Sequence, residues 1–479
     1  MIKLKLSIIA VIFILGPFEA INAKDGKIIL NQPQFPFIFE LNIGEKQTID
    51  RTYKNTTLQK TIKLISFTPF YEPNYWFKET HPVNFYQFNV EIEVNGIPVT
   101  LFYRPYQMPI NFEGLRIYVE NIKLMDESAL YNRKDDMEKQ VRLSVCLKDE
   151  PWGPENIIFP INDYLWHSSV YNNTWGALVP FNQVYYHRGE DYGAIPDKFD
   201  VVSPIDGIII ETPLPDGDGS SNTICIENEY GFTWRMSHMN IEHIDNRYQV
   251  GARVRAGTIV AKTGMTWDGA KKQHSDPHFH TDISIKKINL ASFPYLMESY
   301  LRKYKDPIVA IAGGYRFAIP GQKVVLDASR SIVKNGNIFN VNWKLSNGKL
   351  ADQEQVEIVY DKPGLYAEEL IVENDKGEKD RDFLYVKVFD YDHKYDFTYG
   401  WAYYYPTRNI KTGDTVLFWN RMINTDSDVK INFGDSSNWV TVKNEITHAY
   451  KSKGRYVVTL LSVNEKKEPA TLKMEVIVE

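Results

Sequence analysis

The stretch Pro277-His278-Phe279-His280-Thr281-Asp282-Ile283-Ser284-Ile285 places two histidines at the start of a run that suits a β-strand. Because successive strand side chains point to opposite faces, imidazoles two residues apart project to the same side. Far upstream lies His187-Arg188-Gly189-Glu190-Asp191, where Gly189 permits a bend that brings His187 and Asp191 together. The two stretches predict a β-rich central domain in which imidazole and carboxylate groups meet in one cavity.

Histidine is concentrated in this part of the chain. Six of the ten histidines fall between His187 and His280, and His238 lies midway on a further strand-like run. Catalytic zinc takes three ligands from His, Asp or Glu and keeps a fourth position open for water. An additional histidine can transfer protons, because its ordinary pKa of about 6.5 lies close to neutral pH. The cluster predicts a zinc site with spare imidazoles; an incidental cluster is the alternative.

The order of these motifs resembles the lysostaphin/LytM-type zinc metalloendopeptidases, whose fold is the duplicated hybrid motif. The resemblance covers about 100 residues. The matching elements, in order, are His187–Tyr192, Ser203–Gly207, Ser237–Met239, the glycine-spaced stretch Gly251–Gly264 and Pro277–His280. Members of this family share a β-rich core with an open groove across a sheet, which is the fold expected here.

The resemblance also implies roles for individual residues. It implies that one Zn²⁺ per chain is bound by His187, Asp191 and His280, with His238 and His278 as the catalytic pair. Zinc in such a site lowers the pKa of bound water to about 7. We expect His278 or His238 to accept the water's proton, and zinc and the other imidazole to stabilise the oxyanion.

The sequence departs from the family pattern at three places. Met236 replaces a tyrosine two residues before the middle histidine, and Asp282 takes the place of a glutamate after the closing motif. The segment between Gly264 and His278 is longer than usual and includes Trp267 to His274. None of these changes removes a ligand. The insertion borders the groove, however, so the resemblance does not fix which substrate is bound there.

Composition limits the remaining possibilities. A chain of 479 residues has room for about three or four domains. Its 24% charged and 43% hydrophobic residues are typical of a globular protein, and 14% aromatic residues favour strands. The formal charge of -6 gives no reason to expect nucleic acid or an anionic membrane as a partner.

Residues 1–23 have the layout of a secretory signal peptide. Two lysines precede the apolar run Leu6–Gly16, which Pro17 and a small-residue cleavage site follow. The run is too short to span a bilayer. We therefore expect a secreted protein, periplasmic or extracellular, with no integral membrane segment after cleavage; an uncleaved anchor is the alternative.

Residues 24–150 predict a β-rich domain of unknown role. The alternating run Phe88–Val94 ends at Asn95-Gly96, a strong hairpin signal leading into Val99–Tyr103. The central domain spans 151–305 and ends in the best helical candidate, Phe293–Tyr304. Cys146 and Cys225 lie in strand-like runs, which favours buried unpaired thiols over a bridge between them.

The C-terminal third contains a weak internal repeat, in which a Gly two residues before a Tyr opens a pair of strands. The spacing predicts two Ig-like β-sandwiches at 306–390 and 391–479. Both resemble the polycystic-kidney-disease (PKD) repeat. The first copy does so through Val325–Ser331 and Pro363–Tyr366, and the second through Ile431–Ser436, His448–Tyr450 and Gly454–Tyr456. Such modules act as spacers or surface-binding units.

The sequence therefore predicts a mainly β, secreted zinc metalloendopeptidase. The resemblance implies peptide bonds of peptidoglycan cross-links as the substrate, with contact to surface polysaccharide or protein through the sandwiches as a further possibility. One alternative is a peptidase acting on exported proteins. The other is a non-catalytic, peptidase-like binding or adhesion protein of the cell surface. The five filled site positions favour catalysis.

Overall fold

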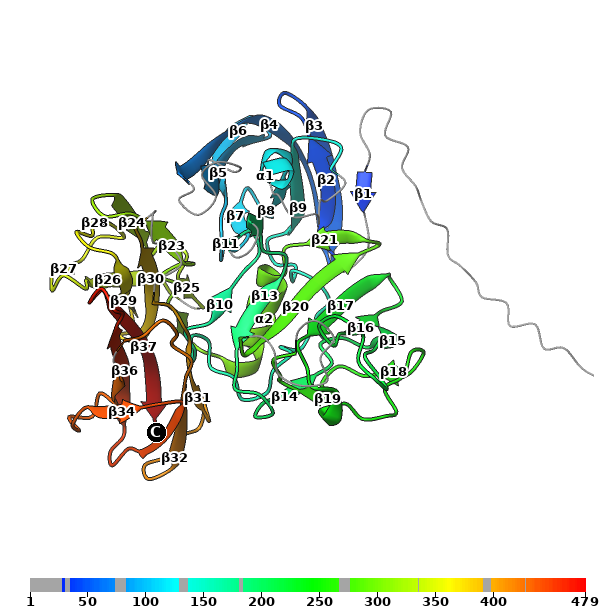
Figure 1. The fold of residues 1–479 in the computed structure, drawn as a ribbon. Coiled ribbons are helices and arrows are strands. Elements are labelled where there is room, and N and C mark those ends of the chain that lie inside the picture. Colours follow the sequence, from blue (N-terminus) through cyan, green and yellow to red (C-terminus); the bar gives the residue numbers. More distant parts are fainter. Residues whose placement is uncertain are drawn as a thin grey trace, which may run out of the picture.

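The computed structural model describes residues 28–30, 35–73, 83–128, 137–180, 184–266, 276–334, 336–390, 398–426 and 428–479. The expected signal peptide and the inserted segment from Trp267 to His274 lie outside these residues. Strands dominate the described part (Figure 1), which confirms the mainly β fold class. None of its helices is long and apolar enough to cross a membrane.

Two sheets and a short helix form the N-terminal block. In the described residues, one sheet has the order β1 (Ile28–Leu30), β2 (Phe37–Leu41), β9 (Val141–Leu147), β8 (Leu115–Ile122), β7 (Ile110–Phe112), and the other β3 (Lys46–Tyr53), β4 (Thr56–Pro73), β5 (Val83–Val94), β6 (Ile97–Tyr103). Helix α1 (Lys123–Ser128) follows β8. Asn95 and Gly96 both have positive φ, the geometry of a tight two-residue turn, so the predicted hairpin between β5 and β6 is confirmed.

The central block is built on a sheet that contains residues of both histidine-bearing stretches. Among the described residues its order is β10 (Asn172–Asn173), β13 (Glu190–Gly193), β20 (His278–Ile285), β17 (Phe232–Ser237), β16 (Ile224–Glu227), β15 (Gly207–Glu211), β18 (Arg253–Val254), and β21 (Ile288–Leu290) also pairs with β20. Smaller elements are β11 (Leu178–Pro180) with β12 (Val184–Tyr186), β14 (Asp200–Val202) with β19 (Ile259–Lys262), and the 3₁₀ turn Ile241–His243. The sheet brings residues nearly a hundred positions apart onto neighbouring strands.

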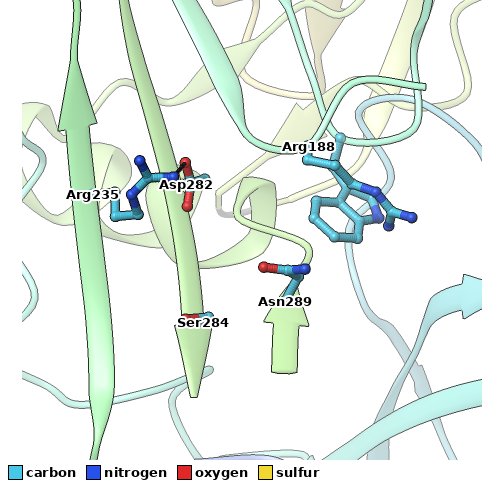
Figure 2. A pocket seen from close by; sticks show the side chains of 6 residues that line it. Arg188, Arg235, Asp282, Ser284 and Asn289 are labelled. Atoms are coloured by element: carbon cyan, nitrogen blue, oxygen red, sulfur yellow. Dashed lines mark hydrogen bonds and ion pairs between the residues drawn. The ribbon is translucent and has the colours of Figure 1, made fainter. Parts of the chain in front are cut away.

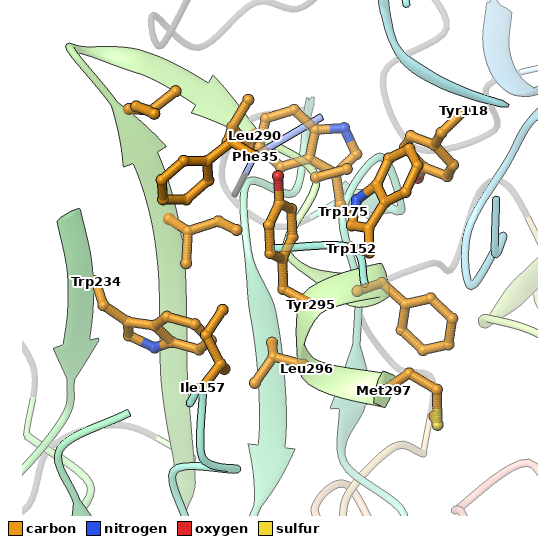
Figure 3. Packing of buried hydrophobic residues seen from close by; sticks show 14 of the residues in the cluster. Phe35, Tyr118, Trp152, Ile157, Trp175, Trp234, Leu290, Tyr295, Leu296 and Met297 are labelled. Carbon is orange, nitrogen blue, oxygen red and sulfur yellow. The ribbon is translucent and has the colours of Figure 1, made fainter. Parts of the chain in front are cut away.

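Helix α2 (Phe293–Tyr304) has the bounds that the sequence predicts, and its apolar side is buried. Figure 3 shows Tyr295 and Leu296 of this helix packed among Trp234 of the central sheet and Phe35 and Tyr118 of the N-terminal block. All five side chains belong to one continuous hydrophobic core. The N-terminal and central blocks therefore share a core and are stabilised together.

The two C-terminal blocks also join through a sheet. In the described residues it runs β23 (Arg316–Ala318), β30 (Lys379–Val388), β29 (Gly364–Asn374), β37 (Pro469–Val478), β36 (Gly454–Val463), β33 (Val429–Asn432), β34 (Val440–Val442), and β26 (Ile338–Lys344) pairs with β29 and with β27 (Leu350–Ala351). The other pairings are β22 (Ile308–Val309) with β25 (Ile332–Val333), β24 (Lys323–Asp327) with β28 (Gln355–Val359), and β31 (Ala402–Tyr405), β32 (Thr415–Asn420), β35 (Glu445–Ala449). A parallel bridge between Leu365 and Ala470 connects the blocks, a continuity that the repeat pattern does not predict.

The two cysteines lie in different sheets. Cys146 on β9 and Cys225 on β16 are both buried, and both are free thiols. Burial raises the pKa of each thiol to about 12. Protonated, covered thiols of this kind are structural and unreactive.

Candidate metal and catalytic site

Strand pairing brings the two histidine-bearing stretches together. In the antiparallel pair β13–β20, Asp191 lies opposite His280, and Gly193 lies opposite His278. On the other side of β20, Ser237 of β17 also lies opposite His280. His238 follows directly in the left-handed region at φ 68°, which turns its side chain out of the strand direction.

Three of the predicted residues converge as a candidate set of metal ligands. One ligand atom from each of His187, Asp191 and His280 lies within 4.8 Å of the other two. The Nε2 atom of His187 is 3.2 Å from Oδ2 of Asp191, and Nδ1 of His280 is 2.7 Å from Oδ1 of the same carboxylate. Two imidazole nitrogens and a carboxylate form the donor set that zinc prefers in catalytic sites.

The second nitrogen of each imidazole in this set is held by an oxygen. Nδ1 of His187 donates to the carbonyl of Gly189 at 3.0 Å, and Nε2 of His280 lies 3.3 Å from Oδ2 of Asp282. Oxygen partners of this kind fix the tautomer and ring orientation of zinc ligands. The residues present therefore fit a zinc ion, with Asp282 orienting His280.

The charges of the set are coupled. Burial opposes ionisation of Asp191, but the charges of His187 and His278 and hydrogen bonds from His187 and His280 hold its pKa well below the ordinary value. Burial also disfavours the charged form of His280, yet hydrogen bonds to Asp191 and Asp282 raise its pKa to about 9. A metal ion that takes this nitrogen at neutral pH displaces a proton.

His238 and His278 form a second pair beside the ligand set. Their ring centroids are 4.3 Å apart, and both residues are buried. Nδ1 of His238 donates to the carbonyl of Thr266, and Nδ1 of His278 to that of Asp276, each at 2.7 Å. With the proton on Nδ1, Nε2 of each ring is a proton acceptor.

Burial lowers the pKa of both rings, that of His238 to well below its ordinary value. Neighbouring imidazoles add to the effect at His238, whereas the Asp191 carboxylate opposes it at His278. Both rings are therefore neutral near pH 7 and can act as bases.

The bend at Gly189 needs the absence of a side chain. Its φ is +129°, and a Cβ built there would lie 2.5 Å from the carbonyl oxygen of Thr281 and 2.8 Å from Cε1 of His280. The chain thus passes directly against the His280 ring, which only glycine allows.

Tyr171 is a site residue that the sequence analysis misses. Its ring stacks on His278 with centroids 4.5 Å apart and planes at 11°, and Trp401 meets Tyr171 edge-on at 4.7 Å. Trp401 comes from the start of the last block, some 230 positions further along the chain. An aromatic residue far from every motif has no local signal that would identify it.

Glu190 directly precedes Asp191 on β13, so its side chain faces away from the candidate ligands. Its Oε1 accepts hydrogen bonds from Thr174 Oγ1, the Trp175 amide and Ser292 Oγ, which tie the loop before β11 and the start of α2 to β13. Burial raises the pKa of Glu190 to about 8. This carboxyl supports the strand that presents Asp191.

The family profile of the PKD domain matches residues 304–388 and, in a second copy, residues 401–478. Both C-terminal blocks are PKD domains. The second PKD domain therefore supplies the ring of Trp401 behind Tyr171. This domain contacts the candidate catalytic site through Trp401 and Tyr171.

Several solved structures are similar to parts of the chain. A protein of Ruminococcus gnavus named after the glycyl-glycine endopeptidase LytM is 21% identical over 30% of this chain and 61% of its own, less than two thirds of its length, with a TM-score of 0.24. The catalytic domain of prophage-encoded EnpA from Enterococcus faecalis is 16% identical and covers 30% of this chain and 94% of its own, with a TM-score of 0.19. A zinc-containing peptidase from Vibrio cholerae is 13% identical and covers 49% of this chain and 85% of its own, with a TM-score of 0.24. At these TM-scores the assignment of the site rests on its own residues.

Proposed function

We propose that this chain is an exported zinc metallopeptidase that hydrolyses peptide bonds of peptidoglycan cross-links. The observation that carries the proposal is the meeting of His187, Asp191 and His280 within 4.8 Å, beside two buried neutral imidazoles. The motif order and the leader-like residues 1–23 support the substrate class and the export, and PKD domains suit a protein that acts outside the cell.

His187, Asp191 and His280 would hold the zinc ion. Bound there, zinc supplies a Lewis acid and makes water acidic enough to act as a nucleophile near neutral pH. Nε2 of His278 or His238 accepts the proton of the attacking water, because Nδ1 of each ring is already committed to a carbonyl oxygen. The imidazolium formed in this way then donates that proton to the leaving amine, with the other imidazole of the pair beside it, and the zinc ion would supply the positive charge that stabilises the oxyanion.

The remaining parts of the chain would support this site. We assign the domains as 24–150, 151–305, 306–390 and 391–479, after a signal peptide at 1–23. The first of these shares its core with the peptidase domain, and the last packs Trp401 against Tyr171. Both therefore position the site, in addition to any contact with the cell surface.

Digestion of purified peptidoglycan tests the proposal. The zinc-loaded full chain is expected to release shortened cross-link peptides, which mass spectrometry identifies together with the bond that is cut. His238→Ala should keep its zinc and release no peptides, because it lacks one member of the proton-transferring pair. The exposed His243, which lies 3.1 Å from Asp197 and outside the cluster, gives the matched control: His243→Ala should digest normally.

Two results would redirect the assignment. If the chain binds zinc and cleaves exported proteins but does not digest peptidoglycan, the proposed substrate changes from peptidoglycan to exported proteins. Digestion by His238→Ala at the wild-type rate would contradict the division of the five residues into ligands and catalytic pair.

A further inference from the structure

A polar hollow of about 360 Å³ lies next to the ligand set on the same face of the central sheet. His280, Asp282 and Ser284 alternate along β20, so all three project to this face. The hollow, the Arg188–Arg235 pocket from here on, is lined by Trp175, Arg188, Arg235, Asp282, Ser284 and Asn289. Its volume is in the range of pockets that hold small ligands or a few residues of a peptide.

The floor of the pocket consists of two cross-strand pairs. Arg235 of β17 lies opposite Asp282, and Asn289 of β21 lies opposite Ser284. Figure 2 shows these four side chains along the strands, with Arg188 on the opposite side of the hollow. Oδ2 of Asp282 is 3.3 Å from His280 Nε2 and 3.5 Å from Arg235 Nη1, so a single side chain separates the pocket from a candidate zinc ligand.

The guanidinium of Arg235 is only loosely paired. Within the described part of the chain, its closest carboxylate oxygens are Oδ2 of Asp282 at 3.5 Å and Oε2 of Glu211 at 3.6 Å. These distances are at or beyond the limit of a hydrogen bond. The side chain is 29% exposed, so part of a cation that can donate five hydrogen bonds faces the pocket. An anion in the pocket would accept hydrogen bonds from this guanidinium.

The opposite wall is fixed by the N-terminal domain. Arg188 forms an ion pair with Asp126 of α1, and its guanidinium lies 4.6 Å above the ring of Trp175. The Trp175 indole in turn donates to the carbonyl of Glu120 on β8 at 3.1 Å. The wall is therefore preorganised, which gives the otherwise unassigned N-terminal domain a part in the pocket.

We propose that the Arg188–Arg235 pocket binds a carboxylate of the peptide substrate and so selects acidic over amidated peptides. The inference rests on the proposed function, because it takes the pocket as a subsite of the same groove. The planar guanidinium of Arg235 suits a carboxylate, to which it can donate two parallel hydrogen bonds, and Arg188 adds positive charge on the opposite wall. The hydroxyl of Ser284 and the amide of Asn289 add polar contacts at the floor. The carboxylate comes from the peptide's C-terminus or from an acidic side chain.

The test compares cross-linked muropeptides that differ in a single carboxylate. One pair has the C-terminal carboxylate free or amidated, and a second pair has the side-chain carboxylate free or amidated. For the pair that carries the recognised group, the zinc-loaded full chain should cleave the acid with a kcat/KM about tenfold or more above that of the amide, since hydrogen bonds to a charged group are strong. The pair that shows the ratio identifies the source of the carboxylate.

Variants assign the effect to the pocket. Arg235→Gln should bring the acid-to-amide ratio close to one, and Arg235→Lys, which keeps the charge but not the fork, should give an intermediate ratio. Arg253→Gln is the matched control, because Arg253 is exposed on β18 at the edge of the same sheet. It should keep the wild-type ratio. Equal rates for acid and amide in both pairs would overturn the proposal.

Binding without turnover separates this inference from the proposed function. Calorimetry with the full-length His238→Ala variant measures the affinity for each muropeptide in the absence of cleavage. Tighter binding of the acid, lost in the His238→Ala/Arg235→Gln double variant, would support the pocket even if the wild-type chain cleaves none of the peptides. Equal affinity for acid and amide, or no binding of either, would refute the pocket whether or not the chain is a peptidase.

Discussion

Replacement of Gly189 by alanine should loosen the ligand set without removing a ligand. A Cβ at this position would lie 2.5 Å from the Thr281 carbonyl oxygen and 2.8 Å from Cε1 of His280. Both distances are shorter than a Cβ atom adopts to a non-bonded neighbour. The backbone or the His280 ring must therefore move. Because displaced supporting contacts typically cost 10- to 100-fold in metal affinity, we expect a loss of about that size for zinc.

Gly251→Ala is the matched control for the strain of the backbone. Gly251 has φ +91° and nothing within 4 Å of a built Cβ, whereas Gly189 has both a positive φ and a close contact. Each variant should lose about 1–3 kcal/mol of unfolding free energy from the left-handed backbone. Only Gly189→Ala should lose a further ~1–3 kcal/mol from overpacking.

Urea unfolding and zinc competition against a chromophoric chelator measure the two quantities. The expected result is a weakened zinc affinity in Gly189→Ala alone and a stability loss that exceeds that of Gly251→Ala. Equal stability losses together with unchanged zinc affinity in both variants would refute the argument that the chain at Gly189 fixes the position of His280.

Three further predictions follow from contacts and charges. Tyr171→Leu should lower kcat by about 2- to 12-fold relative to Tyr171→Phe, since an aromatic pair contributes ~0.5–1.5 kcal/mol; equal rates of the two variants on peptidoglycan peptides would contradict a positioning role at His278. Asp382 is a buried residue of β30, and burial raises its pKa to about 8. The stability that its protonated form contributes is therefore complete below about pH 4 and is lost as the pH rises through 8. Between about pH 5 and 9, the melting temperature of the wild type should therefore fall more steeply with pH than that of Asp382→Asn. Parallel curves of melting temperature against pH would contradict a stabilising role of the protonated Asp382. Addition of zinc at 100 times its dissociation constant should stabilise the metal-stripped chain by about 2.7 kcal/mol, seen as a higher melting temperature, and should leave His280→Ala unchanged.

Local patterns predict the elements that depend on local interactions. Helix α2 has the bounds expected from the apolar spacing of Phe293–Tyr304, and the hairpin at Asn95-Gly96 forms where the turn chemistry places it. The alternation of strand side chains also places His278 and His280 on one face. In each case a few neighbouring residues carry the whole signal.

Contacts between segments that are distant in sequence could not be predicted from local patterns. Tyr171 and Trp401 reach the site through contacts between segments that are distant in sequence, and no motif surrounds them. Arg235 directly precedes the stretch Met236–Met239, but only the pairing of β17 with β20 places it opposite Asp282 in the pocket. The parallel bridge between Leu365 and Ala470 likewise depends on how two repeats meet, which the sequence of either repeat leaves open. The N-terminal block, to which the sequence assigns no role, supplies Asp126 at the pocket wall.

Zinc content of the purified full chain and its single alanine variants tests the central claim most directly. The account predicts one zinc per chain in wild type and in His238→Ala, and less than a tenth of that in His187→Ala, Asp191→Ala and His280→Ala, because each of these three removes a ligand from a three-ligand set. Wild-type protein without zinc, or His280→Ala with a full complement of it, would contradict the account.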